Sequence, residues 1–329
     1  MDNKNLDDIF ENALKKFLIS KRTNRGGQTY NLFDSRDKSR DLLYLKEVFQ
    51  EFYNGASILV GEENKKEIVM QLLNTFNKCQ GIRIDEKDEH IKPLEFLFND
   101  MRQRHNGQLD PEGGVTLAVM RVDGVVMLIP SLKTEIENNL SNQNSQSING
   151  THTFIHEFVH GMSVWTGYEK RSPNLVEYIQ GVRRNDKIRG IWDDLNEGFT
   201  EYITEKILLN IFKGSQYEAM IEKRYPTRVK FVVELLNIFE EKDQQKIITL
   251  YLTGNGRDIL QIFDNVKGPR GKSLTEFLDK NYQDKHRGIS GCQEMGSPLM
   301  KQDEKVLDEI KKFLNKCTYQ AEIEEQNNI

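Results

Sequence analysis

Cysteines are scarce in this chain, and long hydrophobic runs are absent. Cys79, Cys292 and Cys317 are odd in number, lie far apart and form no Cys-x-x-Cys pair. This pattern excludes a disulfide framework and a thiolate zinc site, so we interpret the three as free thiols in a reducing compartment. Nowhere do about 18 apolar residues follow one another, and no basic segment followed by an apolar one opens the chain. We therefore predict a cytoplasmic protein without a signal peptide or membrane span, with unconventional export left open.

Charge of one sign is not concentrated anywhere in the chain. The sequence has 46 Lys and Arg against 51 Asp and Glu, a net charge of −5, and no long basic stripe. Nucleic acid and anionic membranes are therefore disfavoured as principal partners, and a peptide or protein substrate fits better. With 329 residues, of which 37% are hydrophobic, the chain can bury a sizeable core in one large domain or two packed ones. The oligomeric state is left open.

Residues 156–160 read HEFVH and match the zinc pattern H-E-x-x-H. On a helix, His156 and His160 lie one turn apart on one face, so both imidazoles can reach one ion, and Glu157 lies beside that face. A hydrolytic zinc site has three protein ligands and leaves the fourth position to water. The motif therefore predicts Zn²⁺ as the cofactor and metal-assisted hydrolysis, with Glu157 as the general base.

A third ligand is predicted from the segment 194–205, DLNEGFTEYITE. Glu197, Glu201 and Glu205 follow one another at helical spacing among apolar positions. Either Glu197 or Glu201 can complete a His, His, Glu set, whereas Glu205 is expected to be a solvated charge. Asp194-x-x-Glu197 also matches an Asp version of the capping box, in which Glu197 would bond to the helix start instead.

The two segments together resemble the gluzincins, the zinc-peptidase group that includes thermolysin and the aminopeptidases with a W-L-N-E-G-type second motif. The resemblance rests on HEFVH and on NEGFTE at residues 196–201, which matches N-E-x-x-x-[DE], and it covers about residues 150–210. It implies a zinc metallopeptidase in which Glu197 is the third ligand. It also implies that Glu201 accepts a hydrogen bond from a ligand imidazole and so fixes its tautomer.

The spacing of the two motifs departs from that group. Between His160 and Glu197 lie 36 residues, about twice the number in the best-known gluzincins. We therefore expect residues 161–190 to be an insertion, because they are rich in Gly and charge. A surface loop with a short helix around Asn174 to Gln180 is predicted, and such loops often shape specificity.

The wider pattern predicts a mostly helical chain. Apolar residues recur at helical spacing over 5–20, 41–53, 64–79 and 93–103. Helices are expected again after residue 225, the first with Pro226 near its start, and a later helical stretch is broken at Gly254. Residues 22–40 are expected to be a loop or mobile connection.

One stretch predicts strands. Residues 115–130 are rich in β-branched side chains and are broken by Asp123-Gly124, a favoured hairpin turn. An exposed edge there could hold an extended peptide, or the hairpin could simply belong to the core. The predicted fold class is therefore α+β and mostly helical, a zincin-like metallopeptidase domain with a small antiparallel sheet. We divide it into a helical region, 1–110, and a catalytic region with a helical C-terminal subdomain, 111–329.

The start of the metal-binding helix is predicted from residues 137–150, a polar low-complexity stretch interpreted as a loop. Ser147, Asn149 or Thr151 would then cap the helix. His152 would lie in its first turn, where a solvent-facing position is expected rather than a place at the metal.

A donor for the oxyanion of the tetrahedral intermediate is also needed in this chemistry, and in gluzincin-like sites a Tyr or His after the third ligand supplies it. Tyr225 is the first choice and His286, in the segment KHRGIS, the second. Either could instead be an ordinary loop residue. The alternative function is a non-catalytic, zinc-stabilised binding or regulatory module, which would need neither Glu157 nor an open coordination position.

Overall fold

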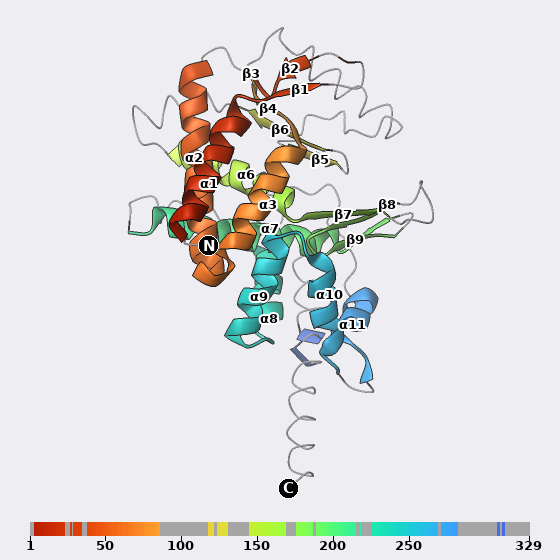
Figure 1. Cartoon of the computed structure of the whole chain (residues 1–329). Helices are drawn as coiled ribbons and strands as arrows, with labels where there is room; N and C mark the ends of the chain where they lie inside the picture. The colour runs from red at the N-terminus through yellow and green to blue at the C-terminus, as the bar shows by residue number, and fades with distance from the viewer. Residues whose placement is uncertain are drawn as a thin grey trace.

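The structure is a computed structural model that describes residues 3–85, 118–130, 145–268 and 271–281. Within these ranges short gaps fall at 24–26, 28, 35–37, 122–123, 169–175, 187–188, 215–217, 219–220 and 222–224, and residues 308–309 and 311–312 are described in addition. Helices account for most of these residues (Figure 1). Among them, no helix combines the length and the apolar composition that a membrane crossing requires.

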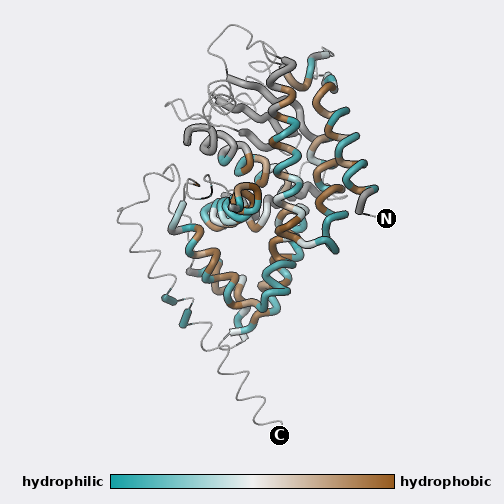
Figure 2. The backbone as a smooth tube through the Cα atoms, turned by 90° about the vertical axis from the view of Figure 1, so that its left-hand side faces the viewer, coloured by the Kyte–Doolittle hydropathy of each residue, from teal (hydrophilic) through white to brown (hydrophobic). Residues whose placement is uncertain are grey.

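Three helices form the N-terminal part: α1 (Asn3–Leu18), α2 (Lys38–Val60) and α3 (Lys65–Lys78), with a 3-10 turn, η1 (Glu62–Asn64), between the last two. The helices predicted over 5–20, 41–53 and 64–79 are confirmed, whereas the one predicted over 93–103 lies outside the described residues. Hydrophobic and hydrophilic residues alternate along these helices (Figure 2), as expected of helices that pack on one face only. An aromatic core fills the space between them, and Phe17 stacks on Phe76 with ring centroids 4.2 Å apart.

The remaining helices carry and surround the two motifs. They are α6 (Ser145–Met162), α7 (Asp193–Phe212), α8 (Pro226–Leu236), α9 (Glu241–Leu252), α10 (Gly256–Asn265) and α11 (Leu274–Asn281). The helix predicted to start near Pro226 and the break at Gly254 are confirmed. Helix α7 is central to the packing because it contacts α2, α6 and α8.

The predicted fold class, a zincin-like α+β domain with one small antiparallel sheet, is wrong, because the described strands form three separate sheets. The hairpin of β5 (Ala118–Arg121) and β6 (Gly124–Pro130) is antiparallel, but β6 also pairs in parallel with β4 (Cys79–Asp85). Parallel to β4 lies β3 (Phe33–Asp34), so the order is β3-β4-β6-β5 and the sheet is mixed. Helices α2 and α3 lie between β3 and β4 in the chain, and a helical crossover is what parallel pairing requires.

The segment 22–40 is not a plain loop either. It contains β2 (Thr29–Asn31), β3 and most of β1 (Lys21–Thr23), and β1 and β2 form a two-stranded antiparallel sheet. The predicted division after residue 110 falls outside the described residues and stays a prediction. Strands from both sides of it nevertheless share the mixed sheet, whose strands β5 and β6 contact α6.

The surface loop with a short helix predicted over 161–190 is wrong. This segment forms an antiparallel sheet in the order β10-β9-β8-β7, from β7 (Val164–Tyr168), β8 (Val176–Gln180), β9 (Arg183–Asp186) and β10 (Arg189–Ile191). The run VEYIQ, interpreted as helical, is rich in the β-branched and aromatic residues that favour strands. Gly181 supplies the turn between β8 and β9 with a φ of 56°, a conformation that costs glycine little.

Candidate metal centre

The HEFVH motif lies in the last turns of α6, which is anchored by the face opposite its histidines. Phe158 and Val159 are buried in the core. The Phe158 ring meets Phe49 and Phe52 of α2 edge to face, with ring centroids 5.0 and 4.9 Å apart. Pairs of this geometry add stability beyond their buried area. The helix that carries the histidines is therefore held rigidly against the N-terminal helices.

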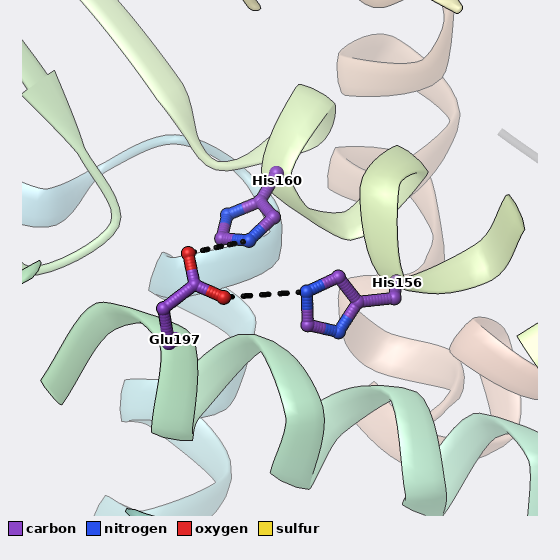
Figure 3. A group of neighbouring side chains, drawn as sticks. All are labelled: His156, His160 and Glu197. Carbon is purple, nitrogen blue, oxygen red and sulfur yellow. Dashed lines mark ion pairs between the residues drawn. The ribbon is translucent and has the colours of Figure 1, made fainter. Parts of the chain in front are cut away.

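His156, His160 and Glu197 converge at the contact of α6 with α7 (Figure 3). The Nε2 atom of His156 lies 3.4 Å from one carboxylate oxygen of Glu197, and Nε2 of His160 lies 3.2 Å from the other. Zinc–ligand bonds of roughly 2.0 to 2.1 Å in tetrahedral geometry place neighbouring ligand atoms about 3.3 Å apart. The ligand atoms of the three side chains all lie within 4.8 Å of one another, so two nitrogens and a carboxylate could hold a zinc ion here.

The group is open on the side of Glu197. The side chain of Glu197 is 33% exposed, whereas those of His156 and His160 are 7% and 8% exposed. A hydrolytic metal site needs such an opening, because solvent or substrate occupies the fourth position. Glu157 follows His156 in α6, and its half-buried side chain carries a charge that raises the pKa of both His156 and Tyr225. The charge of the predicted base therefore acts on both rings.

Glu201 lies on the other side of the His156 ring. Its Oε2 atom is 2.8 Å from Nδ1 of His156, and its Oε1 atom is 2.7 Å from Nε2 of His152. Because Glu197 faces Nε2 of His156 and Glu201 faces Nδ1, only Glu197 is placed to share an ion with both motif histidines. Glu205, one turn further along α7, is half-buried and lies outside this group.

His152 is buried, and the solvent-facing position predicted for it is wrong. Helix α6 begins at Ser145, so His152 lies beyond the first turn and its side chain points into the protein. For the same reason Ser147, Asn149 and Thr151 are inside the helix and none of them is its N-cap. Residues 131–144, which precede the helix, lie outside the described residues. The polar composition of residues 145–150 predicts a loop, although they lie in the first two turns of the helix.

A hydroxyl network orients His160 from behind. Its Nδ1 atom lies 3.1 Å from the Thr200 hydroxyl, which is 2.7 Å from the Tyr251 hydroxyl of α9. Tyr251 in turn donates to Asn196 Oδ1 at 2.8 Å. If Nδ1 of His160 carries the hydrogen, it donates to Thr200 and leaves Nε2 as an acceptor for a metal. The sequence does not predict that Tyr251 lies near the two motifs, because this contact depends on how α9 packs against α7.

Gly181 closes this network on the side of the antiparallel sheet. Its main-chain nitrogen donates to the Ser163 carbonyl at 2.8 Å, which ties the β8–β9 turn to the end of α6. A Cβ atom at position 181 would come within 2.3 Å of Tyr251 and 2.4 Å of Asn196 Oδ1. The turn therefore approaches both residues so closely that only glycine fits without displacement.

Asp194 does not form the capping box that its spacing with Glu197 allows. The N-cap of α7 is Trp192, with no side-chain cap bond, and Asp194 instead forms a buried ion pair of 2.9 Å with Arg228 of α8. The Arg228 guanidinium lies 4.6 Å from the centre of the Tyr225 ring. Asp194 thus helps to hold α8, and Glu197 is left to face the histidines.

Tyr225 lies at the start of α8 with a φ of 49°, and its ring stacks on His156 with ring centroids 5.9 Å apart. Burial and the charge of Glu197 raise the pKa of its hydroxyl above the usual 10.0. Tyr225 therefore keeps its hydrogen at neutral pH and can donate it to an oxyanion. The second candidate, His286, lies outside the described residues.

The charged side chains of the group shift one another's pKa values. Burial alone would lower the pKa of His156, but hydrogen bonds to Glu197 and Glu201 outweigh it and raise that pKa to about 10. Burial opposes the charge of Glu201, yet its bonds to His152 and His156 lower its pKa to about 2. The pKa of Glu197 is likewise held well below 4.5 by the two motif histidines.

Zinc binding is expected to strengthen as the pH rises. With its pKa at about 10, His156 carries a proton at neutral pH that a metal must displace, so affinity should gain about tenfold per pH unit between roughly pH 6 and 9. Competition titrations with a chelating dye across this range measure it. Calorimetry in buffers of different ionisation enthalpy should show proton release on binding, and an affinity independent of pH would contradict the pairing.

Comparisons of the chain with protein families, with curated proteins and with solved structures give no match. The function is therefore argued from the residues and geometry of the site.

Proposed function

We propose that this protein is a zinc-dependent metallopeptidase that hydrolyses peptide bonds with a metal-activated water. The observation that carries the proposal is the approach of both motif imidazoles to one carboxylate at 3.2 and 3.4 Å, from two helices whose motifs are separated in the chain. A glutamate follows the first of these histidines directly in the sequence, as the pattern requires. The resemblance of the two motifs to those of the gluzincins favours a peptide as the substrate class.

The chain's own groups supply the acid, base and donor functions. A zinc ion held by His156, His160 and Glu197 would lower the pKa of its water to about 7 and polarise the substrate carbonyl. Glu157 takes the proton of the attacking water and passes it to the leaving amine. Tyr225 donates its hydroxyl hydrogen to the carbonyl oxygen as negative charge develops there.

The mixed sheet offers a place for the substrate main chain. β5 is the last strand in the order β3-β4-β6-β5, and within the described residues no strand pairs with its outer edge. Both β5 and β6 contact α6, the helix that carries HEFVH. An extended peptide that pairs with the outer edge of β5 would run beside that helix. This favours a role of the hairpin in substrate binding over a purely structural one.

The proposal is tested with full-length protein stripped of metal, resupplied with zinc and freed of excess. Elemental analysis should find one zinc per chain, and a mixed peptide library incubated with the protein should give new termini detectable by mass spectrometry. Cleavage should stop on addition of a chelator and return with zinc. Stoichiometric zinc without any cleavage would favour the binding module instead.

Substitution of Tyr225 by Phe should lower kcat by about 100- to 1000-fold, because the hydroxyl that donates to the oxyanion is lost. The ring remains, so its stacking on His156 and the zinc affinity should stay unchanged. Steady-state kinetics on the best peptide, together with a zinc titration, measure both effects. Tyr202→Phe on α7 is the matched control. Equal kinetics for the two variants would remove Tyr225 from the mechanism.

A further inference from the structure

Two histidines share one buried carboxylate behind the candidate metal centre. His152 and Glu201 are both 0% exposed, and their side chains meet at 2.7 Å. The other oxygen of Glu201 lies 2.8 Å from Nδ1 of His156. Glu201 therefore bridges two imidazoles on α6, of which only that of His156 belongs to the group facing a metal.

In both hydrogen bonds of this bridge, the histidine is the donor and Glu201 is the acceptor. An ionised carboxylate only accepts hydrogen bonds, so Nε2 of His152 and Nδ1 of His156 both donate to Glu201. Once a metal has displaced the hydrogen on Nε2, the hydrogen on Nδ1 of His156 stays with Glu201 and leaves Nε2 of the same ring to bind the ion. The arrangement thus selects the tautomer of His156 that can bind zinc.

His152 matters because Glu201 is buried. Without its donor, Oε1 of Glu201 would be left unpaired away from water, and an unpaired buried charge is strongly unfavourable. The carboxylate would then turn toward another partner, and its bond to His156 would weaken. His160 has no such arrangement, because its Nδ1 bonds to the neutral hydroxyl of Thr200.

We propose that His152 is a positioning residue of the metal centre: by donating to Glu201 it fixes that carboxylate against His156 and so sets the zinc affinity. The inference rests on the zinc site of the proposed function but does not depend on peptide hydrolysis. It assigns His152 a role through another residue, without contact to the ion.

The test compares His152→Gln with His152→Asn in the full chain. The side-chain amide of Gln can reach the place of the imidazole Nε2 and donate to Glu201, whereas that of Asn is shorter and cannot. We expect His152→Asn to weaken zinc binding by about tenfold, the lower range for outer groups around a metal, and His152→Gln to restore most of that loss. Competition with a chelating dye measures the affinities, and circular dichroism checks the fold.

Thr75→Val is the control, because Thr75 is buried in α3, its hydroxyl donates to the Gln71 carbonyl, and it is not part of the His156, His160, Glu197 group. It should alter stability and leave zinc affinity unchanged. If wild-type protein binds zinc and both His152 variants bind it equally well, the positioning role is overturned while the proposed function stands. If wild-type protein binds no zinc, both fail together.

A measurement on the wild-type protein keeps the test valid should His152→Asn not fold. Nitrogen NMR of the zinc-loaded protein, labelled at histidine, reports which ring nitrogen of each histidine carries hydrogen. We expect His152 to carry hydrogen at Nε2 and His156 at Nδ1. A bare Nε2 on His152 would overturn the inference, since it could not donate to Glu201.

Discussion

Replacement of Glu157 by Gln is expected to lower peptide cleavage by about 100- to 10,000-fold while zinc stays bound. The amide keeps the shape of the side chain but cannot take a proton from the attacking water. The three groups that face the ion, His156, His160 and Glu197, are untouched by the change. Cleavage rates and the zinc content of the same preparation measure the two halves of this result.

Glu205→Gln is the matched control for that experiment. Glu205 lies on α7 outside the group that faces the ion, so its replacement should change neither cleavage nor zinc content. If Glu157→Gln keeps the full biological effect of the protein, hydrolysis is not its function. The non-catalytic zinc module would then be the better reading of the site.

Replacement of Glu197 by Gln is expected to weaken zinc binding by more than about 100-fold, the upper range seen for groups one step removed from a metal. The carboxylate charge that faces both Nε2 atoms is lost, and His156 and His160 alone would hold the ion. Titration with zinc in competition with a chelating dye measures the loss. Activity should fall in parallel, because the bound ion is needed for the reaction.

Glu201→Gln provides the comparison that assigns the third ligand. Glu201 bonds to Nδ1 of His156 and to His152, so its loss should weaken zinc binding by only about 10- to 100-fold. A larger effect at Glu201 than at Glu197 would make Glu201 the ligand and contradict the geometry described above. Circular dichroism of both variants separates lost affinity from lost folding.

The three residues that converge, His156, His160 and Glu197, could be predicted from the sequence because the signal is local. HEFVH and NEGFTE each lie within one helix, and helical spacing alone puts their functional side chains on one face. That the two helices meet could not be derived from spacing; it came from the resemblance to known zinc peptidases. In the structure α6 and α7 pack against each other, which brings the two motifs together.

The positions of His152, Tyr251 and β4 could not be predicted from the sequence, for a different physical reason in each case. His152 was misplaced because a polar stretch was interpreted as a loop although it begins a helix at Ser145. Tyr251 joins the site only through the packing of α9, which no short-range pattern reports. β4 was overlooked because its run CQGIRID is short and contains Gly and Arg, and it becomes a strand by pairing in parallel with β6.

The glycines and charged residues of segment 161–190 predict a loop, but the β-branched and aromatic residues between them form the strands of the sheet β7 to β10. Its strands pair with one another in sequence order, so local hairpins suffice to build it. The extra length between the two motifs is thus a folded element rather than a loop.

Gly181 connects that sheet to the candidate metal centre. A Cβ atom at Gly181 would clash with Tyr251 and Asn196. Both residues belong to the hydrogen-bond network that reaches Nδ1 of His160 through Thr200. A methyl group added at position 181 would displace these residues, and the displacement would pass along this short chain of polar contacts to His160. Substitutions at this turn could therefore alter the proposed metal centre while His156, His160 and Glu197 themselves stay unchanged.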